Sequence, residues 1–253
     1  MCLILFAYRC RPDYPLVVAA NRDEFHTRAT AAAHSWPDQP GILAGRDLEA
    51  GGTWLGLHES GKFAALTNIR NPEEQGLNWP RSRGEIVSNY LQSSAKAQEY
   101  VSSLQDDLHN YAGFNLLLSD NSRSFHYFSG RTGELRELKA GIYGLSNGDL
   151  DTPWPKVVSG KAALSAQLES GPTIEGLLSI LANRSIAADA HLPETGVGLE
   201  TERLLSPLFI ESQQYGTRCS TVVLRKADGG ITLVETSFDA SGKVSGSISH
   251  TWA

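Results

Sequence analysis

Cysteine is scarce in this 253-residue sequence, which contains Cys2, Cys10 and Cys219 and a single methionine. An odd number of widely spaced cysteines does not form a disulfide framework and is typical of a reducing compartment. There is no Cys-x-x-Cys, His-Glu-x-x-His or close His/Cys pair. The sequence therefore predicts no metal site.

Basic residues are also in the minority, with 22 Lys and Arg against 28 Asp and Glu and a formal net charge of −6. A nucleic-acid binder usually carries a basic face, so this charge argues against one. No apolar run approaches the roughly 18 residues of a membrane span. The apolar stretch 3–8 lacks the basic start and the small-residue cleavage site of a secretion signal. We expect a soluble, cytoplasmic protein.

No linker, low-complexity tract or fixed repeat interrupts the chain, so residues 1–253 are expected to form one domain. Apolar residues make up 41% and charged residues 20%, as is ordinary for a globular fold with a sizeable core.

Strand-like and helix-like stretches occur in blocks rather than in single alternation, which predicts mainly antiparallel sheets covered by helices, an α+β fold. Residues 2–8 are expected to form an interior strand, because every one of them is apolar. The other expected strands are 16–20, 51–57, 63–69, 114–119, 125–128, 135–143, 219–225, 231–236 and 244–250. The expected helices are 82–91, 95–108, 154–168 and 173–183.

Cys2 combines a nucleophilic side chain with a position directly after the initiator methionine. Thiolate is the reactive form of cysteine and needs a base nearby. If Met1 is removed, the α-amino group of Cys2, with an ordinary pKa of about 7.7–8.0, can act as that base. The alternative is a small apolar residue that opens a buried strand. Cys10 and Cys219 are expected to be buried and inert.

Four polar residues, Asn21 to Glu24, end the apolar stretch that begins at Leu16. A strand end can hold such side chains rigidly beside a pocket. Asp23 is suited to orient an amino group, and Arg22 to bind a carboxylate or phosphate. Asn21 and Glu24 are candidate ligand-binding residues. The four residues also fit a solvated loop with a helix cap.

Further polar candidates lie at or near other expected strand ends. Asn68 and Asn147 can donate to the oxyanion of a tetrahedral intermediate, and Asn115 can bind a ligand, although many asparagines in such places only form turns. Trp54, within the glycine-rich run GGTWLG, is suited to contact a ligand or to mark a tight turn. Arg218 precedes an apolar strand as a substrate clamp or an ion-pair partner.

Together these stretches resemble the NRDE family, also called transport and Golgi organisation 2. The stretches MC, ANRDE, GGTWLG, FAALTN, GLSNGDLDTPWPK and GTRCST occur in that family's order, from Met1 to about Leu224. The resemblance implies an N-terminal-nucleophile (Ntn) hydrolase-like fold, a four-layer αββα sandwich of two mainly antiparallel sheets.

The resemblance also implies roles taken from the cysteine Ntn amidases of the choloylglycine hydrolase type. Cys2 matches the nucleophile, Asp23 the acid that holds the amine, Asn147 the oxyanion donor and Arg218 a late arginine. Those amidases carry an arginine three residues before the acid, where this chain has Ala20.

Two functions follow as alternatives. The first is hydrolysis or transfer of an acyl group from an amide or thioester, which requires no cofactor. The second is a non-catalytic role in which the same pocket carries haem, as in haem trafficking, or an acyl-CoA or lipid. In both cases we expect a small-molecule ligand, no nucleic acid and no integral membrane segment.

Overall fold

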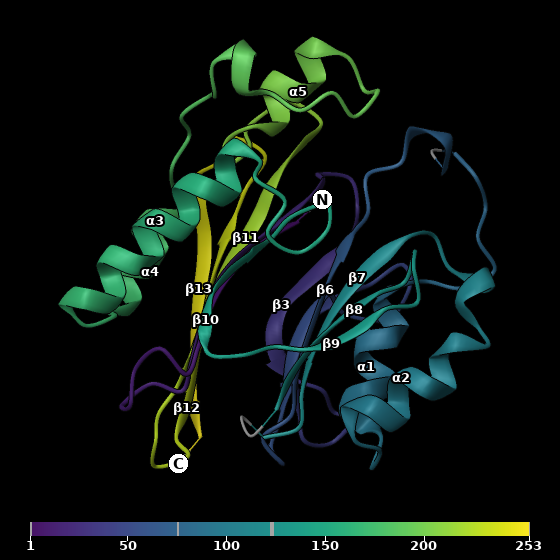
Figure 1. Cartoon of the computed structure of the whole chain (residues 1–253), viewed down its shortest axis with the longest axis vertical. Helices are drawn as coiled ribbons and strands as arrows, with labels where there is room; N and C mark the ends of the chain where they lie inside the picture. Colours follow the sequence, from purple (N-terminus) through teal and green to yellow (C-terminus); the bar gives the residue numbers. More distant parts are fainter. Residues whose placement is uncertain (1, 75, 122–123, 253) are drawn as a thin grey trace. The chain divides into compact units, whose positions relative to one another are not determined.

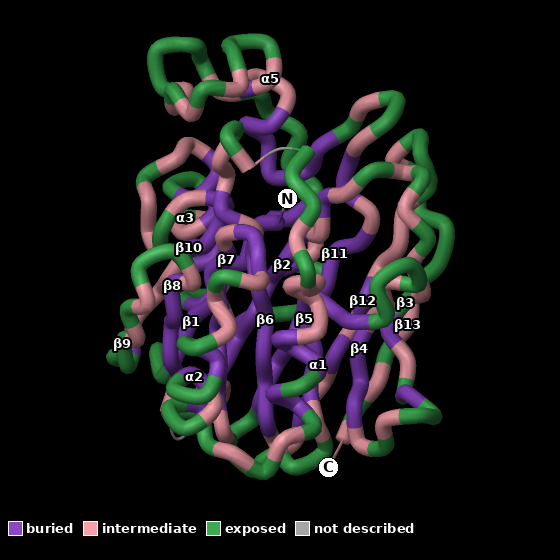
Figure 2. Tube along the Cα trace, turned by 90° about the vertical axis from the view of Figure 1, so that its right-hand side faces the viewer, coloured by how far each residue is buried: buried purple, intermediate pink, exposed green. Residues whose placement is uncertain are grey.

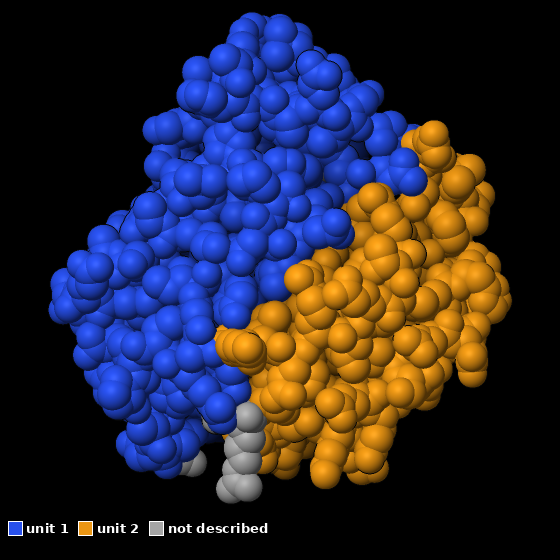
Figure 3. Space-filling model, in the orientation of Figure 1, with its two compact units in different colours: residues 1–27, 70–72, 140–253 blue, residues 28–69, 73–139 orange. Residues whose placement is uncertain are grey.

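A computed structural model describes residues 2–74, 76–121 and 124–252. The removal of Met1, which the sequence raises as a possibility, concerns a residue outside these ranges. The chain divides into two compact units, each with its own antiparallel sheet. Unit 1 comprises residues 1–27, 70–72 and 140–253, and unit 2 comprises residues 28–69 and 73–139 (Figure 3).

The sheet of unit 1 has six strands and brings together segments from both ends of the chain (Figure 1). Each neighbouring pair is antiparallel. In spatial order the strands are β10 (Gly141–Leu145), β1 (Cys2–Tyr8), β2 (Leu16–Phe25), β11 (Tyr215–Arg225), β12 (Ile231–Phe238) and β13 (Val244–Trp252).

Strand β1 is buried along its whole length, as the uninterrupted apolar sequence predicts (Figure 2). One face of β1, β2 and β11 packs against α3 (Pro155–Ser170) and α4 (Ile174–Leu181) (Figure 1). This core includes Leu3, Leu5, Val17, Val222, Val157, Leu164 and Leu177. Each such buried side chain stabilises the fold by roughly 1.5–3 kcal/mol relative to exposure.

Local sequence explains where these helices begin. Pro155 occupies the first position of α3, where its missing N–H costs nothing. Thr173 caps α4, and its Oγ1 accepts the backbone N–H of Gly176 at 3.0 Å. A third, shorter helix, α5 (Leu199–Leu205), follows the 3-10 turn Asp189–His191.

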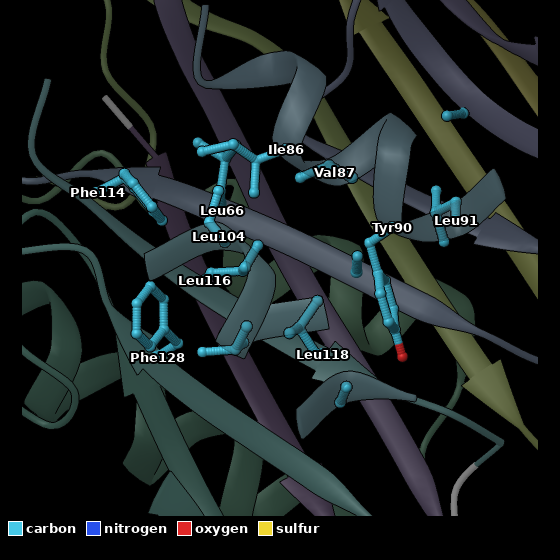
Figure 4. Close-up of a cluster of buried hydrophobic side chains, with 14 of the residues drawn as sticks. Leu66, Ile86, Val87, Tyr90, Leu91, Leu104, Phe114, Leu116, Leu118 and Phe128 are labelled. Carbon is cyan, nitrogen blue, oxygen red and sulfur yellow. The ribbon is translucent and has the colours of Figure 1, made fainter. Parts of the chain in front are cut away.

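The sheet of unit 2 has seven strands that follow one another in sequence order. They are β3 (Thr30–Ser35), β4 (Ile42–Asp47), β5 (Leu55–His58), β6 (Phe63–Asn68), β7 (Phe114–Ser119), β8 (Phe125–Ser129) and β9 (Leu135–Glu137). Helices α1 (Gly84–Gln92) and α2 (Ala97–Gln105) contribute to the core on one face of this sheet. Figure 4 shows that core, with Phe114, Leu116, Leu118 and Phe128 among its members. The short 3-10 turns Pro72–Glu74 and Leu108–Asn110 complete the described elements.

The expected α+β class, the interior strand 2–8 and the four expected helices are confirmed, with helix ends shifted by a few residues. Strands β3 and β4 were not predicted from the sequence. The segment Thr30–Ser35 reads TAAAHS, which is rich in alanine and poor in β-branched residues, so its pairing with β4 overrides its local preference.

The prediction of one strand over residues 135–143 is wrong. The stretch contains two strands that belong to different units: β9 pairs with β8, and β10 pairs with β1. Alternation of apolar and polar residues shows strand character but carries no information on which partner a strand has. The chain passes from unit 2 to unit 1 between Lys139 and Ala140.

Close packing of α3 on β1 gives a stability prediction. A Cβ on Gly160 would lie 2.7 Å from the Cδ1 of Leu5. Gly160→Leu is therefore expected to lower the free energy of unfolding by about 1–3 kcal/mol, because overpacking displaces the helix. Ala162→Leu on the exposed side of the same helix is the control and should stay within about 0.5 kcal/mol. Urea titration measures both, and equal stability of the two variants would contradict this packing.

Candidate active site

Sheet register determines how the first two strands of unit 1 present their polar residues. Cys2 lies directly opposite Arg22, and Leu3 opposite Asn21. Successive side chains of a strand point to opposite faces. Asn21 and Asp23 therefore share the face of Val17 and Ala19, which α3 and α4 cover.

Cys2 is the first residue of β1 and is 7% exposed. Burial raises the pKa of its thiol, and the Asp23 carboxylate raises it further. The Arg22 guanidinium and the backbone N–H of Asp23 act in the opposite direction and favour the thiolate. The thiol thus lies beside groups that can stabilise its charged form, in surroundings that otherwise suppress it.

Asp23 is buried on β2, with 1% exposure. Its Oδ1 accepts a hydrogen bond from the hydroxyl of Thr217 at 2.7 Å. Tyr215 donates its hydroxyl to the main-chain carbonyl of Asp23 at 2.9 Å. Burial raises the pKa of the Asp23 carboxyl, and the positive charge of Lys156 is the largest opposing influence among the described residues.

Arg218 occupies an irregularity between β2 and β11. The register shifts between Thr217, which pairs with Asp23, and Cys219, which pairs with Arg22. A bulge of this kind redirects one side chain out of the regular alternation. The Arg218 Nη1 donates to the carbonyl oxygens of Phe25 at 2.9 Å and His26 at 3.3 Å.

Arg218 and Arg22 influence each other as like charges. Burial lowers the pKa of the Arg218 guanidinium, and the charge of Arg22 lowers it further. The Nη2 of Arg22 lies 3.8 Å from the Oε2 of Glu24, while its buried Nη1 has no acceptor among the described residues. Two guanidinium groups thus lie close to each other on this part of the sheet.

Asn147 follows the end of β10, next to the start of β1. Strand β10 ends at Leu145, opposite Ile4. Ser146 then donates its hydroxyl to the carbonyl oxygen of Cys2 and to the Oδ1 of Asn147, both at 3.3 Å. These contacts bring Asn147 to the strand end where Cys2 lies.

Asn21 is engaged by the fold itself. Its Nδ2 donates to the carbonyl oxygens of Leu181 at 2.9 Å and Leu208 at 2.8 Å, and its Oδ1 accepts the hydroxyl of Ser220 at 2.6 Å. Asn21 thereby fastens the end of α4 to the sheet and holds β2 in place.

Three further candidates belong to unit 2. Asn68 is the last residue of β6 and is half-buried, and Trp54 precedes β5. Asn115 is fully buried: its Nδ2 donates to Thr67 at 3.2 Å, and its Oδ1 accepts the hydroxyl of Tyr127 at 2.7 Å. A part for these residues in the site remains a prediction.

Sequence reasoning missed the buried charges that accompany Asp23. Lys156, the second residue of α3, is 3% exposed and lies within electrostatic reach of Asp23 and Cys2. Arg70 bonds the Oε2 of Glu202 at 2.6 Å, and its backbone N–H donates to the carbonyl of Asn147 at 2.7 Å. One signal was available for Lys156: a lysine in the first turn of a helix opposes the helix dipole.

The prediction that Cys10 is buried is wrong. Cys10 follows β1 in an exposed turn, while Cys219 is buried within β11. The turn of Arg9 to Asp13 carries polar side chains that keep it at the surface, and Cys10 shares that environment.

No group of three or more His, Cys, Asp or Glu side chains is placed to hold a metal ion within the described ranges. Likewise, none of the helices described in the chain has the length and apolar character that a membrane crossing requires.

Comparison with known proteins identifies the family. The family described as "Transport and Golgi organisation 2" matches residues 1–240 of the chain. The chain is 36% identical to the transport and Golgi organization protein 2 homologues of Bos taurus and Homo sapiens, each alignment covering 94% of this chain and 93% of the relative. The chain belongs to the transport and Golgi organisation 2 family. The Drosophila melanogaster member of this family is 29% identical over 93% of the chain.

Solved structures show that this family member has the fold of the Ntn hydrolases. An N-acylethanolamine-hydrolyzing acid amidase orthologue from Caenorhabditis elegans matches with a TM-score of 0.53 and 11% identity, covering 88% of this chain and 92% of that one. Penicillin V acylase from Agrobacterium tumefaciens matches with a TM-score of 0.52 and 14% identity, covering 93% of this chain and 83% of that one. A mutant conjugated bile acid hydrolase from Clostridium perfringens matches with a TM-score of 0.53 and 8% identity, covering 100% of this chain and 97% of that one.

The contacts of Asn21 predict a structural role that can be measured. Asn21→Ala is expected to lower the free energy of unfolding by about 2–4 kcal/mol, because two buried carbonyls and a hydroxyl lose their partner. Asn89→Ala, on the exposed side of α1, is the control and should change stability by less than about 0.5 kcal/mol. A near-neutral Asn21→Ala in thermal and urea unfolding would mean that these hydrogen bonds do not form.

Proposed function

We propose that this protein hydrolyses or transfers the acyl group of an amide or thioester, with Cys2 as the nucleophile. The observation that carries the proposal is the arrangement at the start of β1. There Cys2 lies opposite Arg22 on the neighbouring strand, and its sulfur accepts a hydrogen bond from the backbone N–H of Asp23. The thiol also lies within electrostatic reach of the Asp23 carboxylate.

Burial of the thiol makes a base necessary. A cysteine whose pKa is raised by its surroundings is almost entirely protonated at neutral pH. Removal of Met1 frees the α-amino group of Cys2, which can take the thiol proton and pass it to the leaving group. In this proposal Asp23 holds that amino group, and Asn147, which Ser146 connects to the strand end of Cys2, stabilises the oxyanion.

The names of the solved structures support the class of reaction. The three are named as an N-acylethanolamine-hydrolyzing acid amidase, a penicillin V acylase and a conjugated bile acid hydrolase. The guanidinium groups of Arg22 and Arg218 lie close to each other and favour a substrate that also carries an anionic group.

A second candidate is a carrier of haem or of an acyl compound in the same site, without catalysis. It is favoured by the burial of both Cys2 and Asp23, which raises both pKa values and disfavours the charged form of each. For a carrier, the arginines contribute to binding through charge, and the sulfur of Cys2 contributes little to a large apolar contact.

A covalent intermediate distinguishes the two candidates. Protein that has lost Met1 is expected to gain one octanoyl group on Cys2 when incubated with p-nitrophenyl octanoate, because the thiolate attacks the ester carbonyl, the ester C–O bond breaks and p-nitrophenolate leaves. Intact-mass and peptide mass spectrometry measure the adduct. Cys2→Ala should abolish it, whereas Cys10→Ser should not alter it, since Cys10 lies in the exposed turn. An adduct that persists in Cys2→Ala would exclude Cys2 as the nucleophile.

The arginine clamp is tested by binding. Arg218→Gln is expected to weaken binding of octanoyl-CoA, an anionic acyl compound, about tenfold to a hundredfold, because a charge-assisted hydrogen bond contributes about 1.5–3 kcal/mol. Calorimetric titration measures the affinity, and Arg11→Gln, whose arginine pairs with Asp13 elsewhere in unit 1, is the control. Equal affinities of the two variants would leave Arg218 without a role in binding.

A further inference from the structure

Lys156 stands out as a buried charge that the proposed acyl chemistry does not use. It is the second residue of α3 and is 3% exposed. Its Nζ is buried and has no hydrogen-bond acceptor among the described residues. A buried ammonium carries three donors, and leaving all of them unused is costly.

The position of Lys156 adds to this cost. The N-terminal turn of a helix carries partial positive charge, which disfavours a cation. Burial lowers the pKa of Lys156 to about 8, with the Asp23 carboxylate as the largest opposing influence. Side chains that break several stabilising rules at once are expected at functional sites.

The charged and titratable groups around Lys156 come from several elements of unit 1. The groups whose charge acts on it are Asp23 of β2, Cys2 of β1, Glu202 of α5 and Arg70. The two carboxylates already have other partners: Glu202 bonds Arg70 at 2.6 Å, and the Oδ1 of Asp23 accepts from Thr217 at 2.7 Å. The guanidinium carbon of Arg70 lies 4.6 Å from the centroid of the ring of Trp154, the residue directly before α3.

These neighbours leave the lysine as a donor without an acceptor, next to the strand end where Cys2 lies. We propose that the Lys156 ammonium binds a carboxylate group of the acyl compound held at Cys2, so that the site selects carboxylate-bearing compounds while Lys156 is charged. This rests on the proposed function for the role of Cys2, and it assigns to α3 a binding residue in addition to the arginines of β2 and β11.

Two alkylating reagents of different charge test the proposal at Cys2 itself. Iodoacetate and iodoacetamide both react with the thiolate, so the ratio of their rate constants cancels the thiolate fraction and reports the local charge. At pH 7 the wild-type ratio is expected to exceed that of Lys156→Met by about fivefold, because a nearby cation attracts the anionic reagent. Rates are measured at the Cys2 peptide by mass spectrometry.

The pH profile separates charge from structure. In the wild type the ratio should fall as pH rises through about 8, where Lys156 loses its proton. Lys156→Arg should keep a high ratio and lose this step, because a guanidinium remains charged throughout the range. The α-amino group of Cys2 also titrates near about 7.7–8.0. The profiles are therefore recorded on chains that retain Met1 as well as on processed chains.

An equal rate ratio in wild type, Lys156→Met and Lys156→Arg would overturn the proposal. So would a wild-type ratio that does not fall near pH 8 either in chains that retain Met1 or in chains that lack it.

A binding measurement that does not depend on Cys2 chemistry accompanies these rates. Octanoate should raise the melting temperature of the wild type more than octanamide does, and this difference should vanish in Lys156→Met. If Cys2 resists both reagents, the proposed function fails, and the comparison of octanoate with octanamide decides the role of Lys156 alone.

Discussion

The pairing of β2 with β1 on one side and β11 on the other is the constraint on which the site depends. Because side chains alternate along a strand, a slip of one residue would exchange the two faces. The observed register places Asn21 and Asp23 toward the helices and puts Arg22 opposite Cys2. One continuous strand thus supplies an anchor for the fold, a buried acid and a cation beside the thiol. The bulge at Arg218 then adds a second arginine without disturbing the rest of β11.

Unit 1 buries four charged side chains close to this pairing of strands. Asp23, Lys156, Arg70 and Glu202 lie in the interior of unit 1, where desolvation costs several kcal/mol for each ion before partners offset it. A core built for stability alone would place apolar residues there. The retained charges, with a pKa of Lys156 near 8 and a raised pKa of Asp23, are typical of a site that handles protons or anions.

Sequence reasoning reached the class of fold, while the roles that it assigned to the site residues stay predictions. The apolar run after Cys2 predicted the interior strand, and the polar residues at the end of the next strand predicted where Asp23 and Arg22 would lie. Strands β3 and β4 were missed because an alanine-rich segment such as Thr30–Ser35 shows little strand preference by itself. The division of residues 135–143 between two sheets was missed because alternation does not identify a strand's partner.

One reason explains why the sequence did not indicate the other residues around Asp23. Lys156, Arg70 and Glu202 are ordinary charged residues of a helix or loop in the sequence, and only tertiary packing buries them. Thr217 likewise reads as a common strand residue until its hydroxyl is seen to bond the carboxylate of Asp23. Burial of a polar group depends on elements distant in the chain, so local pattern could indicate the acid but not its surroundings.

The central claim is that Cys2 becomes reactive through its own freed amino group in an otherwise suppressing site. An ultraviolet titration of the Cys2 thiolate in a Cys10→Ser background tests this most directly, using chains that retain and chains that lack Met1. Cys219 stays silent in this titration, because burial raises its pKa well above the usual value. The account predicts a pKa above that of an ordinary cysteine when Met1 is present, and a clear fall when it is removed. The same raised pKa in both chains would contradict it.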